Sequence, residues 1–464
     1  MILSPVDAEF SFAVDVAVVG AGACGLCAGL AAAQAGAEVL ILERDESALG
    51  TTAMSTGLIP AAGSALQKAA GVEDSPEQFA NDICAKSKFR TDENIALSLA
   101  KESAATIDWL VEDQAVPLSL VDSFLYPGHT AKRMHGTPNR TGSELMGSLC
   151  AAAERAEVQI LTEATVTDLF VDDDDRILGL RCRRPDGSNE DLECKALVLA
   201  CCGFAGNPEM VHKYMPEIEA GLFFGHPGNK GDAVKWGTAL GAAVADMNSY
   251  QGHGGVAKGY GIPILWPAIV EGGIQVNQEG LRFSNEALGY SEQAVNVLQQ
   301  SGAVAWTFFD ETRHNLMLEF DDYRDAVTAG AIRSADTLQG ICEQTKLPFD
   351  AMQATLAEID RLAANESADE FGRVFDAKNA LAAPYYAVKV TGALFHTQGG
   401  LVVDENGQVL RPDGSQLPNL FAGGGAARGI SGPDASGYIA GNGLVTATTF
   451  GRLAGITAAK LRRV

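Results

Sequence analysis

Short apolar runs alternate with amphipathic stretches near the start of the chain, a pattern typical of α/β proteins. Residues 14–19 (VDVAVV) are almost continuously apolar and rich in β-branched side chains, as in a buried parallel strand. A small-residue helix over 26–36 (LCAGLAAAQAG) and a second strand over 38–42 follow. The apolar segment 196–203 (ALVLACCG) predicts a further strand of the same sheet.

The periodicity changes further along the chain. Residues 75–115 have a helical period, whereas 166–171 and 177–183 resemble the two strands of a hairpin. The turn between them contains the acidic run Asp172–Asp175. Four carboxylates could bind a divalent ion, but solvated turn aspartates are the interpretation we prefer. Residues from about 250 to 395 interrupt the α/β pattern and predict an inserted domain.

Composition and charge remove several classes of function. The 464 residues carry a formal net charge of −25, and no basic patch of the kind that nucleic-acid binding needs is visible. No apolar run reaches the ~18 residues of a membrane-spanning helix, so we expect no membrane insertion. The start of the chain lacks a basic segment followed by an apolar one, which favours a cytoplasmic protein.

The nine cysteines fit a reducing compartment. Cys24 and Cys27 form a C-x-x-C pair that could be redox-active, but small residues packed in a glycine-rich turn and helix are the preferred interpretation. Histidines and cysteines are otherwise too scattered to predict a metal site.

The first predicted turn has the spacing of a dinucleotide-binding fingerprint. Gly20, Gly22 and Gly25 follow the first strand directly, and Glu43 ends the second strand 23 residues after Gly20. The first glycine makes the turn, the second lets the backbone approach a pyrophosphate, and the third lets helix pack on strand. We expect helix N-terminal amides to bind the phosphates and Glu43 to accept the ribose hydroxyls.

A second glycine-rich segment near the end of the chain favours FAD over NAD. Residues 417–425 (LPNLFAGGG) precede a helix that begins at 441–444 (GNGL). A helix N-terminus suits the flavin pyrimidine, where negative charge appears on reduction. The remaining predicted FAD contacts lie in these segments, in the loop after Glu43 and near the later strands: Thr52, Ser55, Gly57, Val166, Gly203, Gly424, Gly443 and Leu444.

The predicted fold class is therefore α/β, with a Rossmann-like FAD-binding domain and an inserted α+β capping domain. We expect residues 1–250 and 396–464 to form the FAD-binding domain, and residues 251–395 to form the substrate or capping domain.

Four motifs together resemble the fumarate reductase/succinate dehydrogenase flavoprotein superfamily, which includes the 3-ketosteroid dehydrogenases. They are the N-terminal fingerprint, 276–286 (VNQEGLRFSNE), 393–400 (ALFHTQGG) and 441–455 (GNGLVTATTFGRLAG). The resemblance covers nearly the whole chain and implies an FAD-dependent oxidoreductase that acts on adjacent carbon atoms. It does not by itself identify the reaction.

Two positions separate the activities within this superfamily. Fumarate reductases have a proton-donating arginine eight residues after the arginine of G-x-R-F-x-N-E, and a second arginine that clamps a substrate carboxylate. This sequence has Tyr290 and Tyr438 at those positions. A phenol cannot form the bidentate carboxylate contact of a guanidinium. The 3-ketosteroid dehydrogenases have tyrosines at both positions, so the resemblance is closest to them; two tyrosines present only for shape remain the alternative.

This resemblance implies a dehydrogenase that introduces a double bond α,β to a ketone. Tyr290 would remove the α-proton, while Tyr438 and the Gly441 amide would stabilise the enolate oxygen. The ordinary pKa of a tyrosine is about 10, so a basic Tyr290 must have its phenolate stabilised. If Tyr290 is not the base, Tyr126 is the next candidate.

His396 departs from the ketosteroid pattern and matches a histidine of fumarate reductases that contacts a substrate carboxylate. It could polarise the flavin edge, bind a carboxylate of a keto-acid, or form part of the wall. The chain is short for a steroid dehydrogenase, so the substrate could be a ketosteroid or a smaller oxo-cyclohexane compound.

Two rival functions stay open. One is a reductase of an activated C=C bond, which the same residues could serve in the opposite direction; the electron partner is unknown, and no C-x-x-C-H haem motif occurs. The other is a subunit of a membrane complex. Members of such complexes carry a histidine for covalent flavin after the fingerprint, and the loop LGTTAMSTG has none, so we expect non-covalent FAD.

Overall fold

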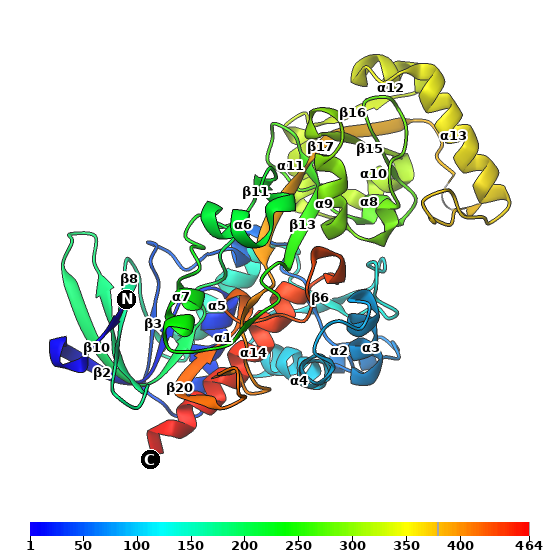
Figure 1. Cartoon of the computed structure of the whole chain (residues 1–464). Coiled ribbons are helices and arrows are strands. Elements are labelled where there is room, and N and C mark those ends of the chain that lie inside the picture. The colour runs from blue at the N-terminus through cyan, green and yellow to red at the C-terminus, as the bar shows by residue number, and fades with distance from the viewer. Residues whose placement is uncertain (378–379, 464) are drawn as a thin grey trace.

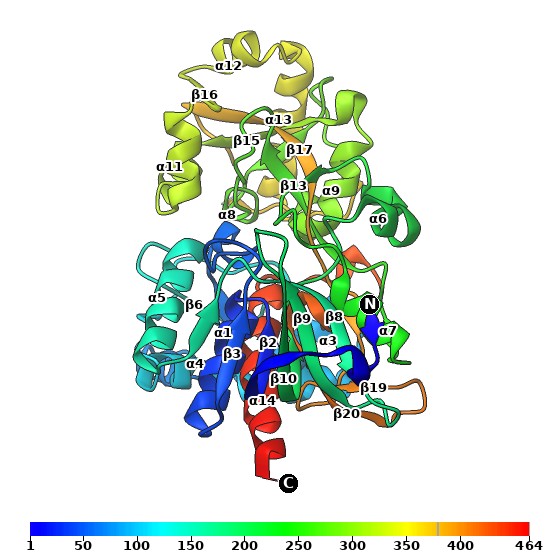
Figure 2. The same cartoon turned by 90° about the vertical axis from the view of Figure 1, so that its left-hand side faces the viewer.

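The first predicted strand is β2 (Phe10–Val19), which lies in the middle of a nine-stranded sheet in the computed structural model. The structure describes residues 1–377 and 380–463. As predicted, β3 (Val39–Leu42) and β10 (Asn189–Leu199) flank β2 in parallel. The other strands of this sheet are β1 (Ile2–Leu3), β7 (Gln159–Leu161), β8 (Thr165–Val171), β9 (Ile177–Arg183), β19 (Gln408–Leu410) and β20 (Gln416–Ala422). Figure 2 shows the central strands side by side in the lower part of the molecule.

Two helices of small residues cover one face of this sheet. Helix α1 (Ala23–Gln34) packs along α14 (Asn442–Ala458), so the first and last helices of the lower part are neighbours (Figure 1). A Cβ at Gly451 or Gly455 would collide with the backbone of α1. Glycine at these positions therefore lets the two helices touch backbone to backbone, which joins the two ends of the chain into one layer.

The helical stretch predicted over 75–115 forms two helices with capped N-termini. Helix α3 (Pro76–Lys86) begins after Ser75, whose hydroxyl accepts the Gln78 amide, and α4 (Glu93–Glu112) begins after Asp92. The neighbouring elements are α2 (Ala65–Ala69), α5 (Gly142–Arg155) and a small sheet of β4 (Ile59–Pro60), β5 (Ser119–Val121) and β6 (Met134–Gly136).

The predicted hairpin is present as β8 and β9, and its acidic run forms a turn. One carboxylate oxygen of Asp172 accepts the amides of Asp174 (3.0 Å) and Arg176 (2.9 Å), and Asp175 pairs with Arg411. Within the described residues, no group of three or more acidic, histidine or cysteine side chains is arranged to hold a metal ion.

A second sheet, of six strands, is organised around the long strand β17 (Tyr385–Thr397). Figure 1 shows β13 and β17 running from the lower part into the upper part of the molecule, where the other elements gather. The strands paired in this sheet are β11 (Leu222–Phe223), β13 (Tyr250–Ala257), β14 (Ile274–Val276), β15 (Ala305–Asp310) and β16 (Ile332–Ala335). Its helices are α8 (Pro267–Val270), α9 (Tyr290–Leu298), α10 (Glu311–Met317), α11 (Asp321–Thr328), α12 (Leu338–Thr345) and α13 (Phe349–Ala364).

The chain crosses between the two sheets through short elements: α6 (Pro208–Tyr214), α7 (Asp232–Ala239), and the pair β12 (Val244–Ala245) and β18 (Gly400–Leu401). The whole is the predicted α/β fold, a parallel-sheet dinucleotide unit joined to an α+β unit. Among the described residues, no helix combines the length and apolar character needed to cross a bilayer.

Candidate active site

A deep cavity lies between the two sheets, with an empty volume of about 1770 Å³, part of it open to solvent. Pockets for drug-sized ligands usually measure about 300–1,000 Å³, so this cavity has room for more than one small molecule. Both parts of the molecule contribute to its wall. Glu43 and the glycine turn line one end, and Tyr290, Trp266 and His253 line the other.

The fingerprint glycines form the turn that the sequence predicts. Gly20 has φ +102°, and a Cβ there would lie 2.7 Å from the Ala200 carbonyl oxygen. Gly22 is the N-cap of α1, and both glycines line the cavity. Gly25 lies behind the lining, where a Cβ would collide with the carbonyl of Gly20. The third glycine thus allows helix–strand packing, while the first two leave backbone exposed to a ligand.

Glu43 directly follows β3, and its carboxylate is fixed at the cavity wall. Its Oε2 accepts the Ala21 amide at 2.8 Å and its Oε1 accepts the Asp45 amide at 3.1 Å, and the residue is 6% exposed. A carboxylate has about four acceptor positions, so two remain for ligand hydroxyls. Beside it, Arg44 donates to the Gly228 carbonyl at 2.6 Å.

The remaining predicted cofactor residues divide into two groups. Thr52, Ser55, Val166, Gly424 and Leu444 line the cavity. The Thr52 hydroxyl also accepts the Ala23 amide at 3.2 Å, which ties the loop after Glu43 to α1.

Gly57 and Gly203 instead lie behind the lining. Gly57 has φ +68°, and a Cβ there would lie 2.7 Å from the Thr141 carbonyl oxygen. A Cβ at Gly203 would collide with the Thr397 hydroxyl. Both glycines therefore allow close packing in this structure, and their contact with the cofactor stays a prediction.

The second glycine-rich turn lies at the N-terminus of α14. Gly441 is its N-cap with φ +82°, and the amide of Gly443 contacts the Tyr438 hydroxyl at 3.4 Å. A Cβ at Gly443 would lie 2.7 Å from Nε2 of His396, so only glycine leaves the histidine in place. With α1 at one end and α14 at the other, two helix N-termini meet one cavity, which fits a dinucleotide with phosphates at α1 and an electron-accepting ring near α14.

Tyr290 and Tyr438, 148 positions apart in the sequence, lie next to each other at the far end of the cavity. Their ring centroids are 5.9 Å apart with planes at 61°. Tyr290 is the first residue of α9 and stacks on His253, with centroids 5.1 Å apart, and Trp266 meets it edge-on. The two tyrosines singled out from the sequence therefore form one pair.

Burial controls the protonation of these phenols. Burial, the neighbouring Tyr438 and Tyr126, and Glu292 hold the pKa of Tyr290 well above its usual value. Burial also raises the pKa of Tyr438 and of Tyr126, which lines the same cavity. Both members of the pair are therefore phenols at neutral pH.

His396 and His253 are neutral imidazoles at the cavity wall. Burial lowers the pKa of both, that of His253 to about 3. Nδ1 of His396 lies 3.2 Å from the Thr397 carbonyl, and the ring centroid lies 5.8 Å from that of Tyr438. His253 accepts the Gly255 amide at Nδ1 (3.1 Å), so its Nε2 carries the proton. No sequence motif marks His253, because its place follows from the pairing of β13 with β17.

Charge is distributed unevenly along the cavity. Arg44 is the only arginine or lysine among the described residues of the lining, and it lies beside Glu43 at the fingerprint end. At the tyrosine end the lining contains Asp322, whose pKa is raised to about 6 by burial and by Asp325. In the part of the chain that the structure describes, the end that holds the tyrosine pair therefore offers no guanidinium to an anionic ligand.

Comparison with known proteins identifies the fold and its cofactor. The family model of the FAD binding domain matches residues 15–444. The chain belongs to this family. It is thus an FAD-dependent oxidoreductase of the fumarate reductase and ketosteroid dehydrogenase superfamily, as the sequence motifs predict.

The relatives include both fumarate reductases and a 3-ketosteroid dehydrogenase. A probable fumarate reductase of Shewanella frigidimarina is 29% identical over 450 residues, which cover 96% of this chain and 75% of that protein. The open conformation of a flavocytochrome c3 fumarate reductase superposes with a TM-score of 0.81 at 28% identity, covering 98% of this chain and 80% of that one. The 3-ketosteroid-Δ4-(5α)-dehydrogenase of Rhodococcus jostii superposes with a TM-score of 0.76 at 26% identity, covering 98% and 99%.

Proposed function

We propose that this oxidoreductase acts on a neutral cyclic ketone and forms a C=C bond α,β to its carbonyl. The observation that carries the proposal is the pair Tyr290 and Tyr438 in a cavity end whose described lining residues include no arginine or lysine. A dicarboxylate bound there would lose its hydration without gaining an ion pair. A ketone needs only hydrogen-bond donors for its oxygen and an apolar wall for its ring.

The tyrosine pair and the α14 turn have separate roles in this proposal. The Tyr438 hydroxyl and the Gly441 amide bind the carbonyl oxygen and stabilise the enolate that develops on it. The phenolate form of Tyr290 accepts the proton from the α-carbon and becomes the neutral phenol. Bound FAD supplies the two-electron acceptor for the hydrogen of the β-carbon. We further propose that residues 251–395 act as a cap that excludes water from the reacting carbons.

The resemblance to ketosteroid dehydrogenases supports this substrate class. The relative from Rhodococcus jostii was solved with 4-androstene-3,17-dione, a neutral ring ketone. The aromatic walls of Trp266, His253 and Phe395 around Tyr290 suit a flat apolar ring. A ketosteroid and a smaller oxo-cyclohexane compound share this chemistry.

The protonation of Tyr290 favours a second candidate, reduction of the C=C bond of an unsaturated ketone. The raised pKa of Tyr290 makes it a proton donor in the resting protein. Donation to the α-carbon is the reverse of the step described above, and the sequence relatives include proteins named fumarate reductases. Because no arginine or lysine is found among the described lining residues of this cavity end, the reductase candidate also takes a neutral substrate.

Anaerobic flavin spectroscopy tests both candidates with one protein sample. Oxidised holoenzyme is mixed with cyclohexanones, 3-ketosteroids and succinate, and bleaching of the flavin is followed. Chemically reduced holoenzyme is then mixed with the matching unsaturated ketones and with fumarate. Bleaching by ketones supports the dehydrogenase, and reoxidation by unsaturated ketones alone supports the reductase. Reaction with succinate or fumarate but no ketone would overturn both.

A further inference from the structure

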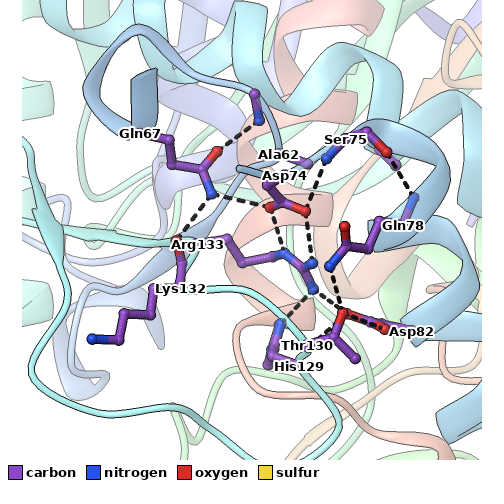
Figure 3. A network of polar contacts seen from close by, with 12 residues as sticks. Ala62, Gln67, Asp74, Ser75, Gln78, Asp82, His129, Thr130, Lys132 and Arg133 are labelled. Atoms are coloured by element: carbon purple, nitrogen blue, oxygen red, sulfur yellow. Dashed lines mark hydrogen bonds and ion pairs between the residues drawn. The ribbon is translucent and has the colours of Figure 1, made fainter. Parts of the chain in front are cut away.

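A buried arginine directly before β6 lies at the centre of a polar network (Figure 3). The Arg133 side chain is fully buried, and its Nε and Nη2 donate to the two carboxylate oxygens of Asp74, both at 2.9 Å. Its Nη1 donates to Asp82 at 2.6 Å and to Nδ1 of His129 at 3.1 Å. Two carboxylates therefore fix the guanidinium, which holds the histidine in turn.

The contact with Arg133 determines which nitrogen of His129 carries the proton. An arginine has donors but no acceptor, so Nδ1 of His129 must accept. Burial and Arg133 lower the pKa of His129 to about 3, so the ring is neutral and its single proton is on Nε2. That Nε2–H donates to the Ala440 carbonyl at 3.0 Å.

The Ala440 carbonyl and the Gly441 amide belong to one planar peptide group. In a trans peptide the C=O and N–H bonds point in opposite directions. A donor that holds the carbonyl oxygen on one side therefore points the amide hydrogen to the other. Ala440 and Gly441 both line the cavity, and among the described residues the Gly441 amide has no hydrogen-bond acceptor. The next two amides are engaged, that of Asn442 by the Ile439 carbonyl and that of Gly443 by Tyr438.

We propose that His129, held by Arg133, is a positioning residue that aims the Gly441 amide at the carbonyl oxygen of the substrate. The proposal rests on the proposed function, because that function supplies the oxyanion. His129 is not among the residues that line the cavity. It acts through the Ala440–Gly441 peptide: its Nε2–H donates to the Ala440 carbonyl, and a hydrogen bond to that oxygen makes the Gly441 amide of the same peptide a stronger donor.

Three substitutions of His129 distinguish orientation of the Ala440–Gly441 peptide by the Nε2–H from a role of the side chain in packing alone. In His129→Gln the side-chain amide can place an N–H near the position of Nε2. His129→Met fills similar space without a donor, and His129→Asn keeps an amide that is too short to reach Ala440. Each FAD-bound holoenzyme is first compared with wild type for flavin content and melting temperature.

The informative measurement is binding of para-substituted phenols to the oxidised holoenzyme. A phenolate is a planar analogue of an enolate, so its affinity reports the strength of the oxyanion donors without any turnover. Wild type should bind more tightly as the acidity of the phenol rises. In His129→Met and His129→Asn we expect phenol affinity to depend less on phenol acidity, and flavin reduction by ketone to be about 10- to 100-fold slower. In His129→Gln we expect the reduction rate to stay within about threefold of the wild-type rate.

Two results would overturn the proposal: wild-type phenol binding and reduction rates in His129→Met or His129→Asn, or equal losses in all three variants. If His129→Met yields no holoenzyme, the comparison of Gln with Asn gives the same decision. Failure of the proposed function looks different, because wild-type flavin would then be inert to every ketone and unsaturated ketone.

Discussion

The two ends of the cavity are built on different principles. At the fingerprint end a ligand meets backbone amides, glycines and the fixed carboxylate of Glu43, all from one β-α-β unit. At the tyrosine end it meets aromatic side chains that come from α9, β13 and the turn before α14. Binding of the shared cofactor is thus encoded locally, whereas the choice of substrate depends on contacts between segments far apart in sequence.

Electrostatics differ in the same way. At the fingerprint end Arg44 forms an ion pair with Asp232, and Nε2 of His226 lies 2.7 Å from a carboxylate oxygen of Asp45. Among the described lining residues, the tyrosine end carries no charge at neutral pH apart from Asp322, because burial keeps Tyr290 and His396 uncharged. A substitution at the first end should therefore weaken cofactor retention, and one at the second end should change the reaction.

The largest expected effect is at Tyr290. Tyr290→Phe removes only the ionisable oxygen, so FAD content should stay at the wild-type level while flavin reduction by ketone falls about 10²- to 10⁴-fold, the usual contribution of a general acid or base. Rapid-mixing absorbance at the flavin band measures this rate. Tyr126→Phe is the matched control, because this buried phenol lines the same cavity. If flavin reduction were as fast as in wild type in Tyr290→Phe but lost in Tyr126→Phe, Tyr126 and not Tyr290 would be assigned as the base.

The pH profile should distinguish the two directions of reaction. Because the pKa of Tyr290 is raised, its phenolate fraction at pH 7–9 is small and grows tenfold per pH unit. Flavin reduction by ketone at low substrate concentration should therefore rise about 100-fold between pH 7 and 9. Reoxidation by an unsaturated ketone uses the protonated phenol, so its rate should stay flat. A flat profile in the oxidative direction would show that Tyr290 is not the base.

This difference between the ends explains what the sequence could predict. Gly20, Gly22 and Glu43 lie close in sequence, and their spacing predicted a turn and a carboxylate that the structure contains. For Tyr290 and Tyr438, only the family resemblance predicted from the sequence that the two side chains lie in one site, where the structure places them next to each other. His253, Trp266 and Asp322 carry no motif, and their position depends on long-range pairing of strands around β17.

Glycines show a second limit of sequence reasoning. Gly57 and Gly203 are predicted to contact the cofactor, and the structure adds a second reason for glycine at both positions, because an added Cβ would collide with Thr141 or Thr397. A glycine can be required by a ligand or by neighbouring backbone, and sequence alone does not distinguish the two reasons.

A smaller effect is expected at the fingerprint end. Glu43→Ala removes a carboxylate that already accepts the Ala21 and Asp45 amides, so the loop geometry and the ribose contacts should both weaken. Hydrogen bonds to charged groups contribute about 1.5–3 kcal/mol, which corresponds to roughly a 10- to 100-fold weaker affinity for FAD. Fluorescence titration of the apoprotein with FAD measures this affinity. Glu38→Ala is the control, because Glu38 is exposed. Equal affinity in both variants would remove Glu43 from the cofactor site.

The smallest expected effect concerns Asp322 at the neutral end. Its folded pKa is raised to about 6, so the carboxyl is uncharged below that pH and charged above it. An apolar ring that covers the charged form must strip water from it, so affinity for a neutral ketone should fall as pH rises through about 6. The neighbouring charges are already engaged: Arg324 pairs with Asp321, and Arg140 pairs with Glu319.

Asp322→Asn should therefore bind an unsaturated ketone about threefold more tightly than wild type at pH 8, and equally at pH 5, because a partly exposed carboxylate is screened by solvent. Spectral titration of the oxidised holoenzyme measures both affinities. Asp325→Asn provides the matched control, since removing this neighbour should shift the transition of Asp322 to lower pH without abolishing it. A pH dependence that persists unchanged in Asp322→Asn would assign the effect to another group and leave this carboxyl without influence on the choice of substrate.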